Sequence, residues 1–336
     1  MSQTWPGGII RGTPVTPAGP FQDGAAPGVW TLSDASYWTD QGLWPTAGVT
    51  PRAVFGGGFL TTNRIDYITI TTTGNATTFG DLTAARLFLT GASSHVRGLF
   101  AGSAGSSGNT IDYVTIMSTG NATDFGDLPA NTGYPAACAS NVISLFAGGM
   151  VSGAQVNTIT YVVTATTGNS TSFGSLSLAR YALSGCGSLT RGLFGGGYTN
   201  TVVNTIDYVT LTSTGDATYF GNLNALVEYS GACSSATRAV FGGGDDGSTN
   251  RAAISVVTIA TLGNASSFGN LSVTRTYLSG TGSATRGVFA GGYTTTYSNV
   301  IDYITFATNG SATDFGDLTV ARYGLGACSN AHGGLT

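Results

Sequence analysis

The chain alternates apolar and polar residues in short stretches, and residues 204–211, Asn-Thr-Ile-Asp-Tyr-Val-Thr-Leu, show the pattern well. Strict alternation over this length predicts a half-buried β-strand. A glycine-rich phrase at residues 191–197 precedes this stretch and predicts a strand of its own. A turn at 214–216, a short strand ending near Phe220 and a further strand of the kind at 179–186 complete a four-stranded unit.

The unit recurs along most of the chain. Its glycine phrase stands at residues 52–58, 97–103, 143–149, 191–197, 238–244 and 286–292, and each phrase has a phenylalanine at the same place: Phe55, Phe100, Phe146, Phe194, Phe241 and Phe289. The repeats are therefore 45 to 48 residues long. Such a period, with a glycine cluster in each unit, is typical of a propeller or a solenoid.

The ends of the repeat region favour the propeller. The first unit opens at Arg52 with the glycine strand and lacks the strand before it, which the last unit supplies at residues 322–328. A solenoid would instead need polar caps at both ends. Glycine in the central strands also lets neighbouring sheets approach closely. We therefore predict an all-β fold, a six-bladed β-propeller of four-stranded blades over residues 51–336 whose ring is closed by the C-terminal strand.

Residues 1–50 lie outside the repeat and are rich in proline and glycine, which predicts an extended arm. The arm holds all the tryptophans of the protein: Trp5, Trp30, Trp38 and Trp44. Tryptophan is both a good core filler and a common interface anchor. Packing against the propeller and docking to a partner as an anchor therefore both remain open.

Charge and hydropathy exclude several classes of function. The 12 basic residues are all arginine and are scattered, and with 16 acidic residues the net charge is −4. Without a basic patch we expect no nucleic acid partner. No run of 18 apolar residues occurs, so no membrane span is expected. The first residues lack the charged and apolar regions of a signal peptide, which predicts synthesis in the cytoplasm.

Sulfur and imidazole groups give little sign of a metal site or a cofactor. Four repeats carry a cysteine where the others have Ala92 and Thr281: Cys138, Cys186, Cys233 and Cys328. A shared position favours buried free thiols over disulfides or metal ligands. No spacing of cysteine and histidine supports zinc. The two histidines, His95 and His332, are expected in surface loops.

Other polar residues also recur by repeat. The Asp of Ile-Asp-Tyr stands at Asp66, Asp112, Asp207 and Asp302, with Thr160 and Ser255 in the other two units. One arginine column comprises Arg52, Arg97, Arg191, Arg238 and Arg286, and a second comprises Arg86, Arg180, Arg275 and Arg322. A ring of cation or anion sites is one interpretation. Repetition favours structural pairing, including Arg–Asp pairs, because a functional site should break the symmetry. The recurring Asn75, Asn121, Asn169, Asn264 and Asn270 are interpreted as turn residues.

The sequence predicts no catalytic residues. A glycosidase needs a set of acidic groups, and Glu228 is the only glutamate. The loops after the glycine phrases do break the symmetry, and loops on a rigid scaffold are where binding surfaces vary. Polar-aromatic loops can stack on sugar rings, and acidic ones are candidates for a cation. The predicted ligand-binding residues are Tyr198, Asp245, Asp246, Tyr293 and Tyr297.

Two resemblances extend these predictions. Arg180, Gly195-Gly196 and Tyr208, with equivalents in most repeats over residues 52–336, resemble the pattern of kelch-type propellers. The final aromatic departs from that pattern, since Phe220 follows Tyr208 by 12 residues where kelch repeats carry a closer tryptophan. The resemblance therefore implies architecture.

The second resemblance concerns the arm. Gly28-Val29-Trp30-Thr31-Leu32, followed by Gln-Gly-Leu-Trp-Pro, resembles segments of virion proteins of tailed, notably marine, bacteriophages. It implies a structural or adhesive part of a phage particle, present in several copies or as a homo-oligomer and anchored to other virion proteins by the arm.

We therefore expect a non-enzymatic virion protein, either a capsid decoration or a tail-fibre or host-attachment component that contacts host surface glycans. Two alternatives remain open: a carbohydrate-active propeller enzyme or lectin, and an intracellular kelch-like adaptor.

Overall fold

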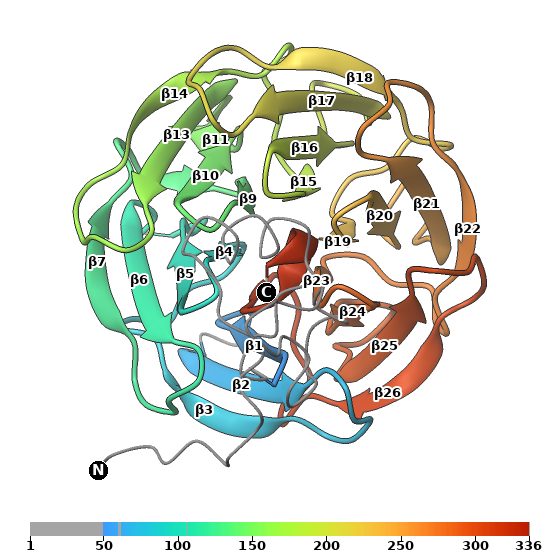
Figure 1. Ribbon diagram of the computed structural model, residues 1–336, viewed down its shortest axis with the longest axis horizontal. Helices are drawn as coiled ribbons and strands as arrows, with labels where there is room; N and C mark the ends of the chain where they lie inside the picture. Colours follow the sequence, from blue (N-terminus) through green and yellow to red (C-terminus); the bar gives the residue numbers. More distant parts are fainter. Residues whose placement is uncertain (1–49, 60–61, 106, 336) are drawn as a thin grey trace, which may run out of the picture. The chain divides into compact units, whose positions relative to one another are not determined.

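The computed structural model describes residues 50–59, 62–105 and 107–335, and a compact unit spans Pro51–Leu335 (Figure 1). Within these residues the regular structure is β-strand, apart from one 3₁₀ helix, η1 (His332–Gly334). The all-β class is confirmed. The described part contains no helix long and apolar enough to cross a membrane. Trp5, Trp30, Trp38 and Trp44 lie outside the described residues.

The described chain forms six four-stranded antiparallel sheets, as the repeat predicts, and one small three-stranded sheet. From the innermost strand outward the sheets are β4(Thr90–Ser93)-β5(Arg97–Ala101)-β6(Thr110–Thr115)-β7(Thr123–Asp127), β9(Ala136–Ala139)-β10(Ile143–Ala147)-β13(Thr158–Val163)-β14(Thr171–Ser175), β15(Ser184–Gly187)-β16(Arg191–Gly195)-β17(Thr205–Thr210)-β18(Thr218–Asn222), β19(Gly231–Ser234)-β20(Arg238–Gly242)-β21(Ala253–Thr258)-β22(Ser266–Asn270), β23(Ser279–Gly282)-β24(Arg286–Ala290)-β25(Val300–Thr305)-β26(Thr313–Asp317) and β27(Gly326–Ser329)-β1(Arg52–Gly56)-β2(Arg64–Thr69)-β3(Thr77–Asp81). The small sheet is β8(Thr132–Gly133)-β11(Met150–Val151)-β12(Ala154–Gln155).

The strands are shorter than the sequence pattern suggests at two places. The glycine strand ends at Gly195, because Gly196 turns away with a φ of 69°. The innermost strand begins at Ser184, because Ala182 has a φ of 57° and breaks the extended backbone after Arg180.

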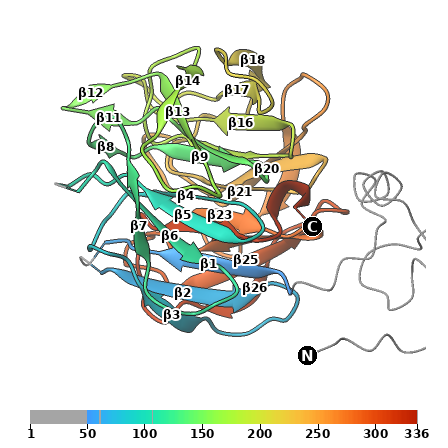
Figure 2. The same cartoon turned by 60° about the vertical axis from the view of Figure 1, so that its left-hand side comes forward.

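The sheets lie around a central axis in a propeller-like arrangement, with their first strands innermost (Figure 1). Figure 2 shows β1, β2 and β3 side by side in one of them. The innermost strand of this sheet, β27, comes from the end of the chain and pairs with β1. Asn330 Oδ1 accepts the N–H of Arg52 at 2.7 Å, as Ser94 Oγ accepts the N–H of Arg97 at 3.1 Å in a continuous hairpin. The last and first strands of the repeat region are thus joined by the same kind of bond that closes a hairpin turn in the other sheets.

Neighbouring sheets touch at their outer edges through glycine. A Cβ at Gly174 would lie 2.2 Å from the carbonyl oxygen of Gly215 in the next sheet, so no side chain fits there. The same contact recurs around the described unit and includes Gly316 of β26 against Gly74. Asparagines in these turns also bond to the outer strand of the neighbouring sheet, since Asn121 Oδ1 accepts the N–H of Asp81 at 3.1 Å. The interpretation of these asparagines as turn residues is confirmed for Asn75, Asn121, Asn169 and Asn264. It is wrong for Asn270, which is the last residue of strand β22.

The second arginine column forms buried ion pairs. Arg180 Nη2 lies 3.0 Å from Asp207 Oδ2, and both side chains are fully buried. Arg180 also donates to the carbonyl oxygens of Phe194, at 3.2 Å, and Thr205, at 2.8 Å. The same pair occurs as Arg86–Asp112, Arg275–Asp302 and Arg322–Asp66. The predicted structural pairing is therefore confirmed for this column.

The first arginine column joins neighbouring sheets. The Arg191 guanidinium lies 4.5 Å from the centre of the Tyr208 ring and donates to the carbonyl oxygen of Ile259 at 2.6 Å. Arg52, Arg97, Arg238 and Arg286 make equivalent contacts with a ring and with a neighbouring carbonyl. These arginines are structural, as their repetition predicts.

Candidate functional site

One end of the central channel is closed by six aromatic side chains, here called the aromatic mouth: Phe88, Tyr134, Tyr181, Tyr229, Tyr277 and Tyr323. Each sheet contributes one ring from the segment just before its innermost strand. The centroid distances between neighbours run from 4.0 Å, between Tyr229 and Tyr277, to 6.3 Å, between Tyr181 and Tyr229. The remaining neighbours lie 4.4 to 5.8 Å apart, so the rings form an unbroken circle.

An unusual backbone conformation holds these rings in place. In four sheets the aromatic residue itself has a left-handed backbone, with φ from 54° to 57° at Phe88, Tyr134, Tyr229 and Tyr277. Bulky residues rarely adopt this conformation, and it is concentrated at functional sites. In the other two sheets the left-handed residue is Ala182 or Gly324. There the aromatic residue stands one position earlier, so every sheet still supplies one ring.

The predicted tyrosines of the loops extend this surface. Tyr198 lies 5.4 Å from Tyr181 between ring centroids. Tyr293 and Tyr297 lie 5.7 Å and 5.5 Å from Tyr323, which also stacks on Phe59 at 4.9 Å. The structure thus places all three predicted tyrosines at the aromatic mouth.

The two predicted aspartates have different surroundings. Asp245 faces Glu228 across a short bridge, in which each backbone N–H donates to the other residue's carbonyl oxygen at 2.9 Å. Asp246 holds its own loop: it accepts the N–H groups of Thr249 and Ser248 and pairs with Arg251 at 2.8 Å. These contacts, the Thr249 N–H first among them, lower the pKa of Asp246. The residues that the structure describes contain no cluster of three or more His, Cys, Asp or Glu side chains able to hold a metal ion.

Glu228 is the unusual acid of the mouth. It is 9% exposed, and within the described chain its buried Oε2 has no hydrogen-bond partner. Burial, together with the negative charge of Asp245, raises the pKa of Glu228 to about 7. Thr276, at the equivalent position of the next sheet, likewise has a buried hydroxyl without a partner among the described residues. Two unsatisfied polar groups therefore accompany the closely packed rings of Tyr229 and Tyr277.

The mouth is shallow. The depression between its rings has a volume of about 70 Å³, well below the roughly 300–1,000 Å³ of an enclosing ligand cleft. A ligand would therefore lie on the rings rather than inside them. Aromatic faces with a few convergent polar groups are typical of a binding surface.

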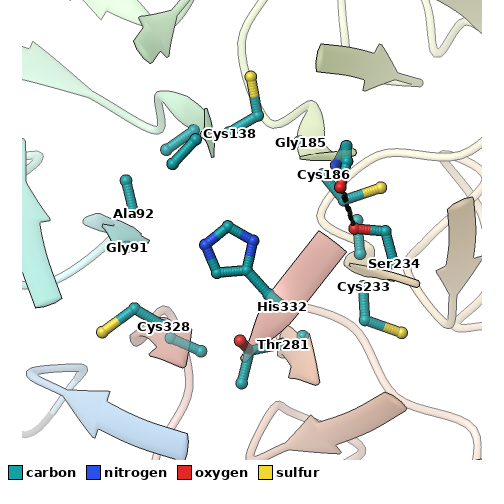
Figure 3. A pocket seen from close by; sticks show the side chains of 16 residues that line it. Gly91, Ala92, Cys138, Gly185, Cys186, Cys233, Ser234, Thr281, Cys328 and His332 are labelled. Carbon is teal, nitrogen blue, oxygen red and sulfur yellow. Dashed lines mark hydrogen bonds between the residues drawn. The ribbon is translucent and has the colours of Figure 1, made fainter. Parts of the chain in front are cut away.

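The opposite end of the channel is closed by His332 (Figure 3). Its ring points into a cavity of about 40 Å³ lined by the four cysteines and by small residues of the innermost strands. His332 Nε2 lies 2.9 Å from the carbonyl oxygen of Ser93, and burial lowers the pKa of the imidazole. The surface-loop prediction is thus wrong for His332, because the chain turns into η1 after β27. It is confirmed for His95, which is exposed.

The cysteines are buried and free, as their shared position predicts. The thiol of Cys138 packs against the neighbouring sheet, where a Cβ at Gly192 would lie 2.4 Å from its Sγ. Burial raises the pKa of all four thiols, that of Cys186 to about 12. They therefore remain protonated and unreactive near neutral pH.

Glu228 should make stability depend on pH. Its pKa is raised to about 7 in the fold from 4.5, so between these values the folded chain keeps a proton that the unfolded chain releases. The contribution is complete below the lower value and is lost as pH rises through about 7. We expect Glu228→Gln, a neutral isostere, to flatten the fall in melting temperature between about pH 5 and about pH 8. Parallel profiles for the two proteins would contradict this account.

The sequence matches no protein-family model and no curated protein. The site therefore rests on its own geometry. Sequence reasoning identified the loop tyrosines but missed the six rings of the mouth and Glu228. The signal for the rings was an aromatic residue one or two positions after each second-column position, at Phe88, Tyr134, Tyr181, Tyr229, Tyr277 and Tyr323.

Proposed function

We propose that the six sheets are the blades of a closed six-bladed propeller, and that this propeller is a non-enzymatic component of a tailed-phage particle that binds glycans. Three contacts between the first and last sequence repeats support closure. β27 pairs with β1, Gly316 packs on Gly74, and Arg286 donates to the carbonyl oxygen of Ile70 at 3.1 Å. The particle role, as decoration or host attachment, is supported by the resemblance of the arm.

The aromatic mouth carries the binding part of the proposal. Tyrosine faces suit the apolar faces of sugar rings, while their hydroxyl groups can reach the sugar hydroxyls. Glu228 and Thr276, each next in sequence to a ring of the mouth, have buried polar atoms without a partner in the described chain, and such atoms gain most from a hydrogen bond. A shallow surface suits the end or side of a surface glycan.

The two ends of the channel fit different roles. Strand β4 runs from Thr90, next to the mouth, to Ser93, whose carbonyl oxygen contacts His332 at the other end. Arg52, where the described unit begins, bonds Asn330 at that second end. The described chain therefore begins at the end of the channel opposite the mouth.

Labelling of purified particles tests the particle role. We expect an antibody raised against residues 51–336 to mark regular positions on heads or tails in electron micrographs. Particles that carry no label, from an infected culture in which the protein is detected, would reject a virion role and leave glycan binding to be judged separately.

The environment of Glu228 supports a second candidate function, that of a carbohydrate-active enzyme. A carboxyl group with a pKa of about 7 beside the carboxyl group of Asp245 has the properties of a general acid. This function predicts release of reducing sugar from bound glycans and its loss in Glu228→Gln with binding retained. Intact glycans after prolonged incubation would reject it.

A further inference from the structure

One junction between sheets lacks the arginine that the other five contain. At those five junctions a first-column guanidinium lies 4.3 to 5.3 Å from the centre of an aromatic ring and donates to a carbonyl of the next sheet. Between the sheets of β10 and β16 the position is occupied by Ile143. No side-chain donor in the described chain reaches the carbonyl oxygen of Leu211, which is the equivalent acceptor. The Tyr161 ring at this junction likewise has no arginine over it among the described residues.

The missing arginine leaves an open groove. It has a volume of about 530 Å³ and is lined by Ile143, Tyr161, Phe173 and Leu211, with Val142 and Leu189 at its edge. Val142 is 63% exposed and Leu189 is 40% exposed. Ile143 is shorter than arginine and carries no donor, so it cannot reproduce the bond to the next sheet.

We propose that this groove binds an arginine side chain of a partner polypeptide. The five filled junctions show what the architecture accommodates: a planar cation on an aromatic face, with an N–H directed at a backbone carbonyl. The face of Tyr161 and the carbonyl oxygen of Leu211 carry partial negative charge, which complements a guanidinium group. The apolar edge matches the methylene stem of an arginine side chain.

The groove lies away from the aromatic mouth. Its lining includes Asn141 and Val142, in the hairpin turn between β9 and β10. This turn is at the His332 end of the channel, where the chain also enters the described unit. A partner could therefore be held here while the mouth remains open to a ligand, and the proposal does not depend on glycan binding.

Titration of the full-length protein, with tyrosine rings labelled for NMR, tests the proposal. The probes are the peptide acetyl-Gly-Arg-Gly-amide and its citrulline counterpart, which has the same shape without the charge. We expect a saturable shift of the Tyr161 ring signals with the arginine peptide and about tenfold weaker binding of the citrulline peptide. An absent shift, or equal shifts with both peptides, would overturn the proposal.

Two variants test whether the peptide binds in the groove. Ile143→Arg should place a guanidinium of the chain itself over the Tyr161 ring, and so abolish the Tyr161 shift without lowering the melting temperature. Arg191→Ile should open the corresponding groove at the next junction and give the Tyr208 ring a new arginine-dependent shift. A Tyr161 shift that survives Ile143→Arg in the folded protein would show that the peptide binds elsewhere.

Discussion

Replacing Arg180 by valine should lower the free energy of unfolding by about 3–5 kcal/mol. The substitution leaves the fully buried carboxylate of Asp207 without its cation, and the hydroxyl and N–H of Ser177 remain as its partners. The carbonyl oxygens of Phe194 and Thr205 lose a donor as well. Urea denaturation followed by circular dichroism measures the loss. A change below about 1 kcal/mol would mean that the buried pair contributes no more than an exposed one.

The chain contains its own control for this variant. The sheet of β20 has Val227 and Ser255 where its neighbours have the Arg–Asp pair, and Ser255 Oγ bonds Asn224 instead. This alternative set packs well, leaving a void of only about 10 Å³. Arg180→Val combined with Asp207→Ser and Ser177→Asn should therefore be more stable than Arg180→Val alone, because no buried charge remains unpaired. A triple variant as unstable as the single one would contradict this explanation.

Gly174→Ala should cost about 3 kcal/mol, because the added Cβ would lie 2.2 Å from the carbonyl oxygen of Gly215. The turn of the next sheet would have to move. That movement would break the bond from the Gly215 N–H to the Phe173 carbonyl oxygen, at 2.9 Å, and the bond from the Ser175 N–H to Asp216 Oδ1, also at 2.9 Å. Thermal and urea unfolding measure the effect.

Gly215→Ala is the matched control. Gly215 forms the other side of the same contact, but a Cβ there would meet nothing within 4 Å and its φ is not in the left-handed range. We expect a change within about 0.5 kcal/mol. Equal losses from the two substitutions would show that glycine is needed for backbone flexibility rather than for the close approach of the sheets.

The strands and the buried ion pairs could be predicted because their signals recur at equivalent positions, the strands in all six repeats and the Arg–Asp pair in four. Arg180 and Asp207 each belong to a column, and the two columns lose their charges in the same repeats. One repeat has Thr132 and Thr160 at these positions, and another has Val227 and Ser255. The buried cysteines follow from the same regularity. Local alternation and repetition are thus sufficient to predict the features that most sheets share.

The candidate site was harder to predict because it depends on departures from the repeat. The rings of the mouth occupy two different positions of the repeat. Tyr229 has a left-handed backbone itself, whereas Tyr181 stands one residue before the left-handed Ala182. Glu228 is the only glutamate and belongs to no column, so the repeat gave no signal for its burial. The surface-loop prediction failed for His332 because the chain turns into η1 after β27, which brings the imidazole into the channel.

The measurement that tests the central claim most directly is a glycan array probed with the full-length protein and with three variants. We expect the wild-type protein to bind a defined set of glycans, and Tyr229→Ala and Tyr277→Ala to lose that binding while remaining folded. Tyr219→Ala, which removes an exposed ring of β18 outside the mouth, should bind like the wild type. Binding that survives both mouth substitutions, or no binding by the folded wild-type protein, would contradict the assignment of the aromatic mouth as a glycan-binding surface.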